Sequence, residues 1–146
     1  MTRSLRDSIG RSLGASDWFT IDQPLINQFA EITGDHQFIH VDKAAARKTE
    51  FGDTIAHGML TLSLSVSLIE PFLEPYICGK TVLNYGSNKV RFLRPVKCDS
   101  KVRLKPEILS VVEKNDDQLL VTINAILELK NESKPAFVAE LLVLII

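Results

Sequence analysis

Hydrophobic residues recur with a helical period in the first half of this chain and alternate with polar ones in the second half. An aromatic and β-branched stretch at 17–21 predicts a short strand. A helix is predicted over 23–33, capped by Thr20 or Asp22 and ended by Gly34, which can adopt a positive φ. Residues 35–41 then predict a loop or a short extended segment. Asp42 is expected to cap a short helix over 43–49.

A long apolar helix is predicted to begin near Gly58. Apolar residues lie on nearly every side of it: Met59, Leu60, Leu62, Leu64, Val66, Leu68 and Ile69. A helix that is apolar all round is typically buried by the elements around it. Pro71 and Pro75 are expected to end it at about Glu70, because an internal proline removes a backbone donor and clashes with the preceding turn. The apolar run is then too short to cross a bilayer.

The rest of the chain favours strands over 81–84, 88–93, 100–113, 119–129 and 136–146. Pro106 inside the third of these predicts an edge position or a bulge. Tight turns at 115–117 and 131–135 join the three long strands into an antiparallel meander. The last strand is apolar on both faces, so we expect it inside the sheet or in a subunit contact. The pattern predicts an α+β fold with the sheet curled round the central helix.

Composition excludes some classes of partner but does not identify a function. The chain has 146 residues, which predicts one domain over 1–146, with 1–15 as a frayed segment or short helix. A net charge of −1 argues against nucleic acid or an anionic membrane as a partner. Cys78 and Cys98 match no metal or redox spacing, and no apolar segment typical of a signal peptide follows the N-terminus. We therefore expect a reducing, cytoplasmic location.

The candidate chemistry lies in the run Thr33-Gly-Asp-His-Gln-Phe-Ile-His40 and in the start of the long helix. Asp35 and His40 place a carboxylate and an imidazole on one short segment, where they can exchange protons near neutral pH. Gly58 lets a ligand oxygen approach a free N–H at a helix N-terminus. Such a set suits proton transfer beside a carbonyl. Purely structural interpretations also stay open. Asp35 can be a turn or capping residue, His40 a half-buried histidine with a satisfied hydrogen bond, and His57-Gly58 only the start of the helix.

Three ordered motifs carry a family resemblance. They are residues 29–42, which contain Gly-Asp-His-Gln-Phe-Ile-His40; the Ile-Ala-His-Gly-Met run at 55–59; and Asn84-Tyr-Gly86 with Lys89-Val-Arg-Phe92 ahead of Pro95-Val96. Together they resemble the MaoC-like hydratases, which include (R)-specific enoyl-CoA hydratases of hot-dog fold. The NodN-like branch is the most similar, because Gln37-Phe38 stands where the wider family has Asn-Pro.

This resemblance implies an (R)-specific hydration of a trans-2-enoyl-CoA to an (R)-3-hydroxyacyl-CoA, or the reverse dehydration. The enzyme would be a lyase of fatty acid metabolism. Asp35 and His40 would activate water, and the amide of Gly58 would polarise the thioester carbonyl. The other substrate-binding candidates are Ala56, His57, Met59, Asn84 and Arg91. The resemblance also implies a homodimer with no metal and no bound cofactor, and coenzyme A or acyl carrier protein as the carrier of the substrate.

Several alternatives accompany this interpretation. Asn84 also suits a turn, and Lys89, Arg91 and Arg94 can either meet the phosphates of CoA or form the wet face of a strand. Some relatives carry a serine on the central helix that bonds the catalytic aspartate; its counterpart here is Val66, between Ser65 and Ser67. The competing functions are an acyl-CoA thioesterase and a non-catalytic acyl-thioester binding domain. Hot-dog thioesterases commonly place their carboxylate on the central helix, where we expect only Glu70.

Overall fold

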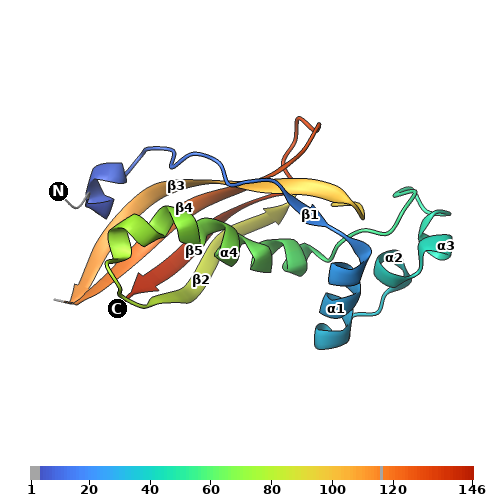
Figure 1. The fold of residues 1–146 in the computed structure, drawn as a ribbon, viewed down its shortest axis with the longest axis horizontal. Helices are drawn as coiled ribbons and strands as arrows, with labels where there is room; N and C mark the ends of the chain where they lie inside the picture. The colour runs from blue at the N-terminus through green and yellow to red at the C-terminus, as the bar shows by residue number, and fades with distance from the viewer. Residues whose placement is uncertain (1–3, 116) are drawn as a thin grey trace.

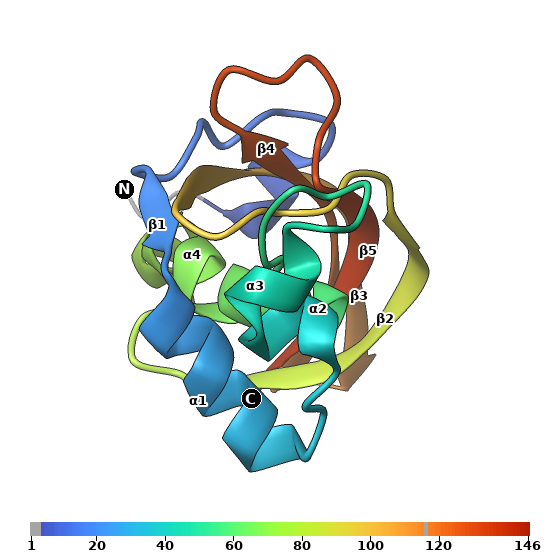
Figure 2. The same cartoon turned by 90° about the vertical axis from the view of Figure 1, so that its right-hand side faces the viewer.

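The computed structural model describes residues 4–115 and 117–146. The elements are η1 (Leu5–Ser8), β1 (Phe19–Ile21), α1 (Gln23–Thr33), α2 (Phe38–Val41), α3 (Lys43–Ala46), α4 (Gly58–Ile77), β2 (Val82–Phe92), β3 (Ser100–Asn115), β4 (Gln118–Leu129) and β5 (Phe137–Ile145). A five-stranded antiparallel sheet has the order β1-β3-β4-β5-β2. The sheet curves around α4, and α1, α2 and α3 cluster beyond the N-terminal end of that helix (Figures 1 and 2). The predicted α+β hot-dog arrangement is confirmed.

The core forms where the inward residues of the strands meet α4. Strand residues alternate between the two faces of a sheet, so every second side chain of β3, β4 and β5 points inward. Phe137, Leu104, Ile123 and Leu127 are fully buried there, and Leu73 of α4 joins the same cluster. The predicted meander is present, and β5 lies between β4 and β2, inside the sheet.

The N-terminal segment covers the outer edge of β3. The amides of Gly10, Leu13 and Ser16 donate to carbonyls of Ile108, Pro106 and Leu104 at 2.8, 3.0 and 2.9 Å. Pro106 lies on that side of the sheet past the end of the short β1, which agrees with the predicted edge position. Of the two alternatives expected for this segment, the short helix is present as η1, while residues 1–3 lie outside the described residues.

The central helix differs from its prediction in length and in burial. It does not end at Glu70 but continues through Pro71 and Pro75 to Ile77. The two prolines are four residues apart on the exposed face, where the carbonyls that lose a donor can bond to water. The opposite face keeps Ile69 and Leu73 buried, which offsets the lost bonds. The helix is also not covered all round, because Met59 and Val66 are 56% and 51% exposed.

Three other local predictions are wrong. Residues 38–41 form a helical turn and not a loop or extended segment, since Asp42 N–H donates to the Phe38 carbonyl at 2.9 Å. The helix after Asp42 ends at Ala46, because the Thr49 hydroxyl binds the Ala46 carbonyl and accepts from Phe51 N–H. The strands expected at 81–84 and 88–93 are one strand, β2, whose two irregularities against β5 interrupt the alternation.

The continuation of α4 past the prolines is testable by truncating Leu73. This side chain is 1% exposed, so Leu73→Ala is expected to lower the free energy of unfolding by about 2–5 kcal/mol through lost burial and a residual cavity. Urea denaturation measures the change. Ile32→Ala, at an 84% exposed position of α1, is the control and is expected to stay within about 0.5 kcal/mol of wild type. Equal effects of the two substitutions would contradict the observed helix.

Candidate active site

Helix α1 and the turn after it place Asp35. The Asp22 carboxylate caps α1 by accepting from Leu25 N–H at 3.0 Å, as predicted. Gly34 ends the helix at φ 75°, a left-handed conformation that glycine adopts without a Cβ clash. Asp35 follows at once. Asp35 Oδ1 accepts from Gln37 N–H at 3.3 Å, so this side chain does form a turn. Its Oδ2 has no hydrogen-bond partner among the described residues.

Helix α2 turns His40 inward. The imidazole is only 7% exposed, and its Nδ1 lies 2.6 Å from the Ile55 carbonyl oxygen. A carbonyl can only accept, so Nδ1 carries the proton and the lone pair of the neutral ring lies on Nε2. Burial is the main cause that lowers the pKa of His40 below its ordinary value of 6.5; the nearby His57 also lowers it, and the Ile55 bond and Asp35 partly oppose this. The geometry therefore leaves Nε2 free as a neutral base.

His57 stands at the N-cap of α4, directly behind His40. The two imidazole rings are stacked, with centroids 3.8 Å apart and planes 24° from parallel. Nε2–H of His57 donates to the backbone carbonyl of Asp35 at 2.9 Å. A carboxylate oxygen of Asp35 and one ring nitrogen of each histidine lie within 4.8 Å of one another. The tertiary structure thus brings His57, from the start of α4, to Asp35 and His40, which lie on one short segment.

These three side chains are also the one group of potential metal ligands in the described part of the chain. One nitrogen of each ring is already bonded to a carbonyl. The two rings are stacked, with their planes 24° from parallel. The carbonyl on one nitrogen of each ring fixes which nitrogen carries the proton and which carries the lone pair.

A cavity of about 310 Å³ opens beside this group. Its walls are His40, Ile55, Ala56, Gly58, Thr61, Phe92, Leu93, Arg94, Pro95 and Val96. No side chain caps the start of α4, so its first N–H groups are available to a ligand. A Cβ at Gly58 would lie 3.1 Å from the Phe92 ring, which explains why the smallest residue stands here. The cavity therefore offers a neutral imidazole and helix N–H groups on one wall.

The other predicted site residues divide between two places. Ala56 lines this cavity, and its N–H donates to the Val96 carbonyl at 2.7 Å. Met59 and Asn84 instead line a second, larger cavity of about 500 Å³ between α4, β2 and β5. Arg91 lines neither cavity, and its guanidinium donates to the Val90 carbonyl.

Of the three cationic residues considered for phosphate contact, only Arg94 lines the cavity that contains His40. Lys89 is paired with Glu140 at 2.7 Å. Sequence reasoning missed Thr61 and Phe92 as cavity walls; Phe92 stands in the third motif, but nothing local indicates that its ring packs against Gly58. Ser65 and Ser67 donate to the carbonyls of Leu62 and Leu64, so neither hydroxyl bonds to Asp35.

A family model described as the MaoC like domain matches residues 4–129. The chain belongs to the MaoC-like dehydratase family. It is 41% identical over 140 residues to the 3-hydroxyacyl-thioester dehydratase Z of Mycobacterium tuberculosis, covering 95% of this chain and 91% of that protein. It is 43% identical over 139 residues to Nodulation protein N of Rhizobium leguminosarum bv. viciae, covering 94% and 86%. The resemblance to this family and its NodN-like branch is confirmed, as is an enzyme of the hydratase and dehydratase class.

Solved structures support the fold of this MaoC-like dehydratase. A monoamine oxidase regulatory protein from Archaeoglobus fulgius superposes with a TM-score of 0.80 at 26% identity, covering 94% of this chain and 89% of the other. The (R)-hydratase from A. caviae superposes with a TM-score of 0.76 at 24% identity, covering 92% and 94%. No helix in the described ranges has the length and apolar character needed to cross a membrane.

The lowered pKa of His40 predicts a dependence of stability on pH. Below about pH 6.5 the unfolded chain protonates this ring more readily than the folded chain, so the free energy of unfolding falls as the pH drops toward the folded pKa. His40→Gln is expected to remove this contribution, as measured by urea denaturation between about pH 8 and pH 5. His36→Gln, at an exposed histidine, is the control and should keep it. If the free energies of unfolding of wild type and His40→Gln change with pH in parallel, His40 makes no such contribution.

Proposed function

We propose that this enzyme catalyses the reversible (R)-specific hydration of a trans-2-enoyl thioester to an (R)-3-hydroxyacyl thioester. The observation that carries the proposal is the meeting of Asp35 and the unprotonated Nε2 of His40 beside the start of α4. The names of the relatives, a 3-hydroxyacyl-thioester dehydratase and an (R)-hydratase, support the same reaction. A lyase of fatty acid metabolism in the cytoplasm stays a prediction.

The residues present can complete the reaction without a net change in their own protonation. Water gives a proton to the Asp35/His40 pair as its oxygen bonds to C3 of the substrate. The electrons of the C2=C3 bond move toward the thioester carbonyl, whose oxygen gains negative charge and accepts from the Gly58 amide. The Asp35/His40 pair then returns a proton to C2. One preorganised donor of this kind is worth roughly 3–4 kcal/mol in the transition state.

The two cavities suggest how the substrate lies. Arg94 lines the cavity with His40 and holds Glu132 only loosely, at 3.6 Å, so it is available for phosphates of a coenzyme A or carrier-protein arm. The larger cavity begins at Met59, next to Gly58, and continues along the apolar side of α4 past Val66 to Leu73. We assign the acyl chain to this apolar groove, with coenzyme A acting as substrate carrier and no bound cofactor or metal.

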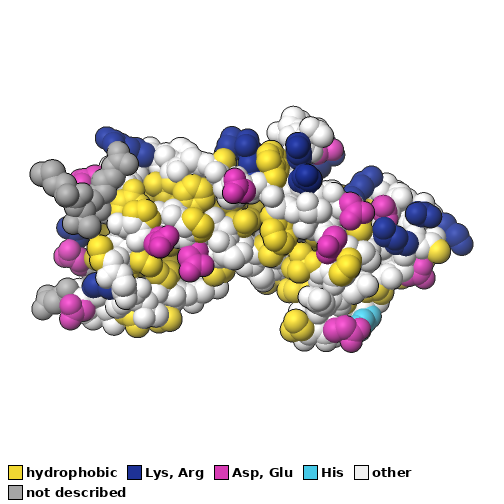
Figure 3. All heavy atoms as spheres, viewed as in Figure 1, with side chains coloured by type: hydrophobic (Ala, Val, Ile, Leu, Met, Phe, Trp, Pro, Cys, Tyr) yellow, Lys and Arg dark blue, Asp and Glu magenta, His cyan; other side chains and the backbone are white. Residues whose placement is uncertain are grey.

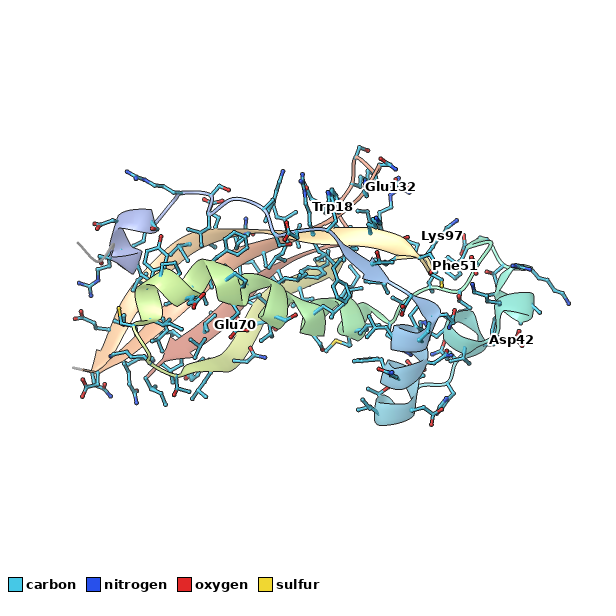
Figure 4. All side chains as sticks on the ribbon, viewed as in Figure 1. Trp18, Asp42, Phe51, Glu70, Lys97 and Glu132 are labelled. Atoms are coloured by element: carbon cyan, nitrogen blue, oxygen red, sulfur yellow. The ribbon has the colours of Figure 1, made fainter. Side chains whose placement is uncertain are left out.

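A thioesterase is less well supported by the positions of the acids on α4. The expectation of Glu70 as the only acid on this helix is wrong, because α4 continues far enough to include Glu74 as well. Glu70 and Glu74 lie twelve and sixteen residues beyond Gly58, which corresponds to about 18 and 24 Å along a helix. Figure 4 shows Glu70 on α4, far from the end of the molecule where Asp42 and Phe51 lie near the cluster of short helices. A carboxylate at that distance cannot reach a thioester held at the helix start.

Substitution of the acid and the base tests the proposed reaction. Asp35→Asn and His40→Ala are each expected to lower the rate of crotonyl-CoA hydration by about 10²–10⁴, because each removes a partner in proton transfer. Loss of the conjugated thioester absorbance measures hydration, on crotonyl-CoA and on longer enoyl-CoA substrates, with the chirality of the product checked.

Asp17→Asn and His36→Ala are the matched controls, since both side chains are exposed and outside the cavity. Circular dichroism confirms that each variant is folded. Wild-type rates in Asp35→Asn and His40→Ala would refute the assignment. Release of free thiol from acyl-CoA would favour the thioesterase, and tight acyl-CoA binding without turnover would favour a binding domain.

We further propose that the enzyme is a homodimer joined through β2. This strand is the outer edge of the sheet, and an exposed edge of eleven residues invites pairing with another chain. Leu83 and Tyr85 on it are 43% and 56% exposed. Apolar side chains also reach the surface over and beside α4 (Figure 3). A structurally similar chain belongs to a structure described as the HadBC (3R-hydroxyacyl-ACP dehydratase) complex from Mycobacterium tuberculosis.

Sedimentation tests the dimer. The wild type is expected to sediment at twice the chain mass of 16.3 kDa, and the double variant Leu83→Asp with Tyr85→Asp at one chain mass, because two carboxylates on the edge oppose pairing. Val112→Asp, at a position of β3 that is 50% exposed, is the control and should stay dimeric. A monomeric wild type at micromolar concentration would exclude this interface.

A further inference from the structure

His57 is the member of the histidine pair that does not face the substrate cavity. His40 and Gly58 line that cavity, whereas His57 is absent from its walls and is only 4% exposed. Its ring lies behind His40 and beside Phe29, whose ring centroid is 5.1 Å away. A polar side chain that is so deeply buried is expected to make a specific hydrogen bond, because burying it without one would lower the stability of the fold.

The first partner of His57 is the backbone of Asp35. The Asp35 carbonyl lies just past the end of α1, where no further helical N–H can reach it, and it accepts Nε2–H of His57 at 2.9 Å. The other bonds of Asp35 are local and longer, at 3.4 Å from its N–H to Thr33 and 3.3 Å from its carboxylate to Gln37. The bond to His57 is therefore what ties this turn to the start of α4.

The second partner is the ring of His40. Stacking at 3.8 Å fixes one face of that imidazole, while the bond from Nδ1 to the Ile55 carbonyl fixes its rotation. We propose that His57 is a positioning residue, which holds the Asp35 turn and the His40 ring so that the carboxylate and Nε2 meet at the substrate. This inference rests on the proposed function, because it assigns His57 a part in the same reaction.

The charges around His40 give the inference a measurable signature. The groups that act on it are Asp35 from the turn after α1 and His57 from the start of α4, and Arg94 lines the same cavity. Nδ1 of His57 is buried and has no hydrogen-bond partner among the described residues, so the bond from Nε2–H to the Asp35 carbonyl is the hydrogen bond that its ring makes there. Burial and the nearby His57 both lower the pKa of His40, and replacing the His57 side chain is expected to raise that pKa.

Two substitutions separate the two contacts. His57→Phe keeps a stacked ring but loses the donor to the Asp35 carbonyl. His57→Gln keeps a donor of similar reach but loses the ring. His36→Gln replaces an exposed histidine that is 3.7 Å from Glu31 and serves as the matched control. The measurements are kcat and KM for crotonyl-CoA across pH, and the pKa of the His40 ring by NMR titration.

We expect His57→Phe to lower kcat by about tenfold to a hundredfold with KM within about threefold, because a small displacement of the acid is enough to disrupt proton transfer. His57→Gln is expected to retain more of kcat than His57→Phe at about pH 8. Its activity should fall at a higher pH than that of wild type as the solution is acidified, since His40 must be neutral to accept a proton, and the NMR pKa of His40 should rise by the same amount. His36→Gln should change none of these values.

The proposal would be overturned by two results together: a kcat of His57→Phe within about twofold of wild type, and an activity of His57→Gln that falls at the same acidic pH as that of wild type. If His57→Phe does not fold, His57→Gln decides the proposal, through the pH at which its activity falls on acidification and through the pKa of His40. A wild type that hydrates no enoyl thioester refutes the proposed function instead. In that case a His40 pKa that rises in His57→Gln but not in His36→Gln supports the positioning of His40, and an unchanged pKa rejects it.

Discussion

Two buried imidazole N–H groups each donate to a backbone carbonyl, and the arrangement of the site follows from these bonds. His40 donates to the Ile55 carbonyl, and His57 donates to the Asp35 carbonyl. The two bonds therefore join the segment that contains Asp35 and His40 to the segment that contains Ile55 and His57. A buried donor that loses its acceptor destabilises the folded state by about 1–3 kcal/mol, so substitutions that break either bond are expected to be unfavourable. They also select the tautomers. Because Nδ1 of His40 and Nε2 of His57 carry the protons, Nε2 of His40 is the nitrogen left for chemistry.

The start of α4 supplies the complementary group. A helix N-terminus offers free N–H donors, and the absence of a side-chain cap leaves them available at the cavity. Phe92 comes from the far end of β2 and occupies the space that a Cβ of Gly58 would need. The sheet curves around α4 (Figure 2), and at the end of β2 the Phe92 ring lies against Gly58. The same packing buries Leu73 and lets the helix continue past two prolines.

Local signals account for most of what could be predicted. Asp22, Gly34 and Asp42 act within a few residues of their own positions, so the ends of α1 and the start of α3 follow from residue type. The spacing of Asp35, His40 and Gly58 indicated proton chemistry beside a carbonyl. Two of the wrong predictions concern features that a distant partner decides: the passage of α4 through Pro71 and Pro75, whose cost is offset by the core, and the continuity of β2, which depends on pairing with β5.

The sequence by itself determined the residue types of the site, the caps that place them, the meander of β3, β4 and β5, and the family. Only the tertiary structure decided that His57 stacks on His40 and binds the Asp35 backbone, that Arg94 and not Arg91 lines the cavity, and that Met59 faces a separate groove. The reason is physical. The acceptors of the ring nitrogens and the walls of the cavities come from segments far apart in the chain, and their approach depends on how the sheet packs against α4.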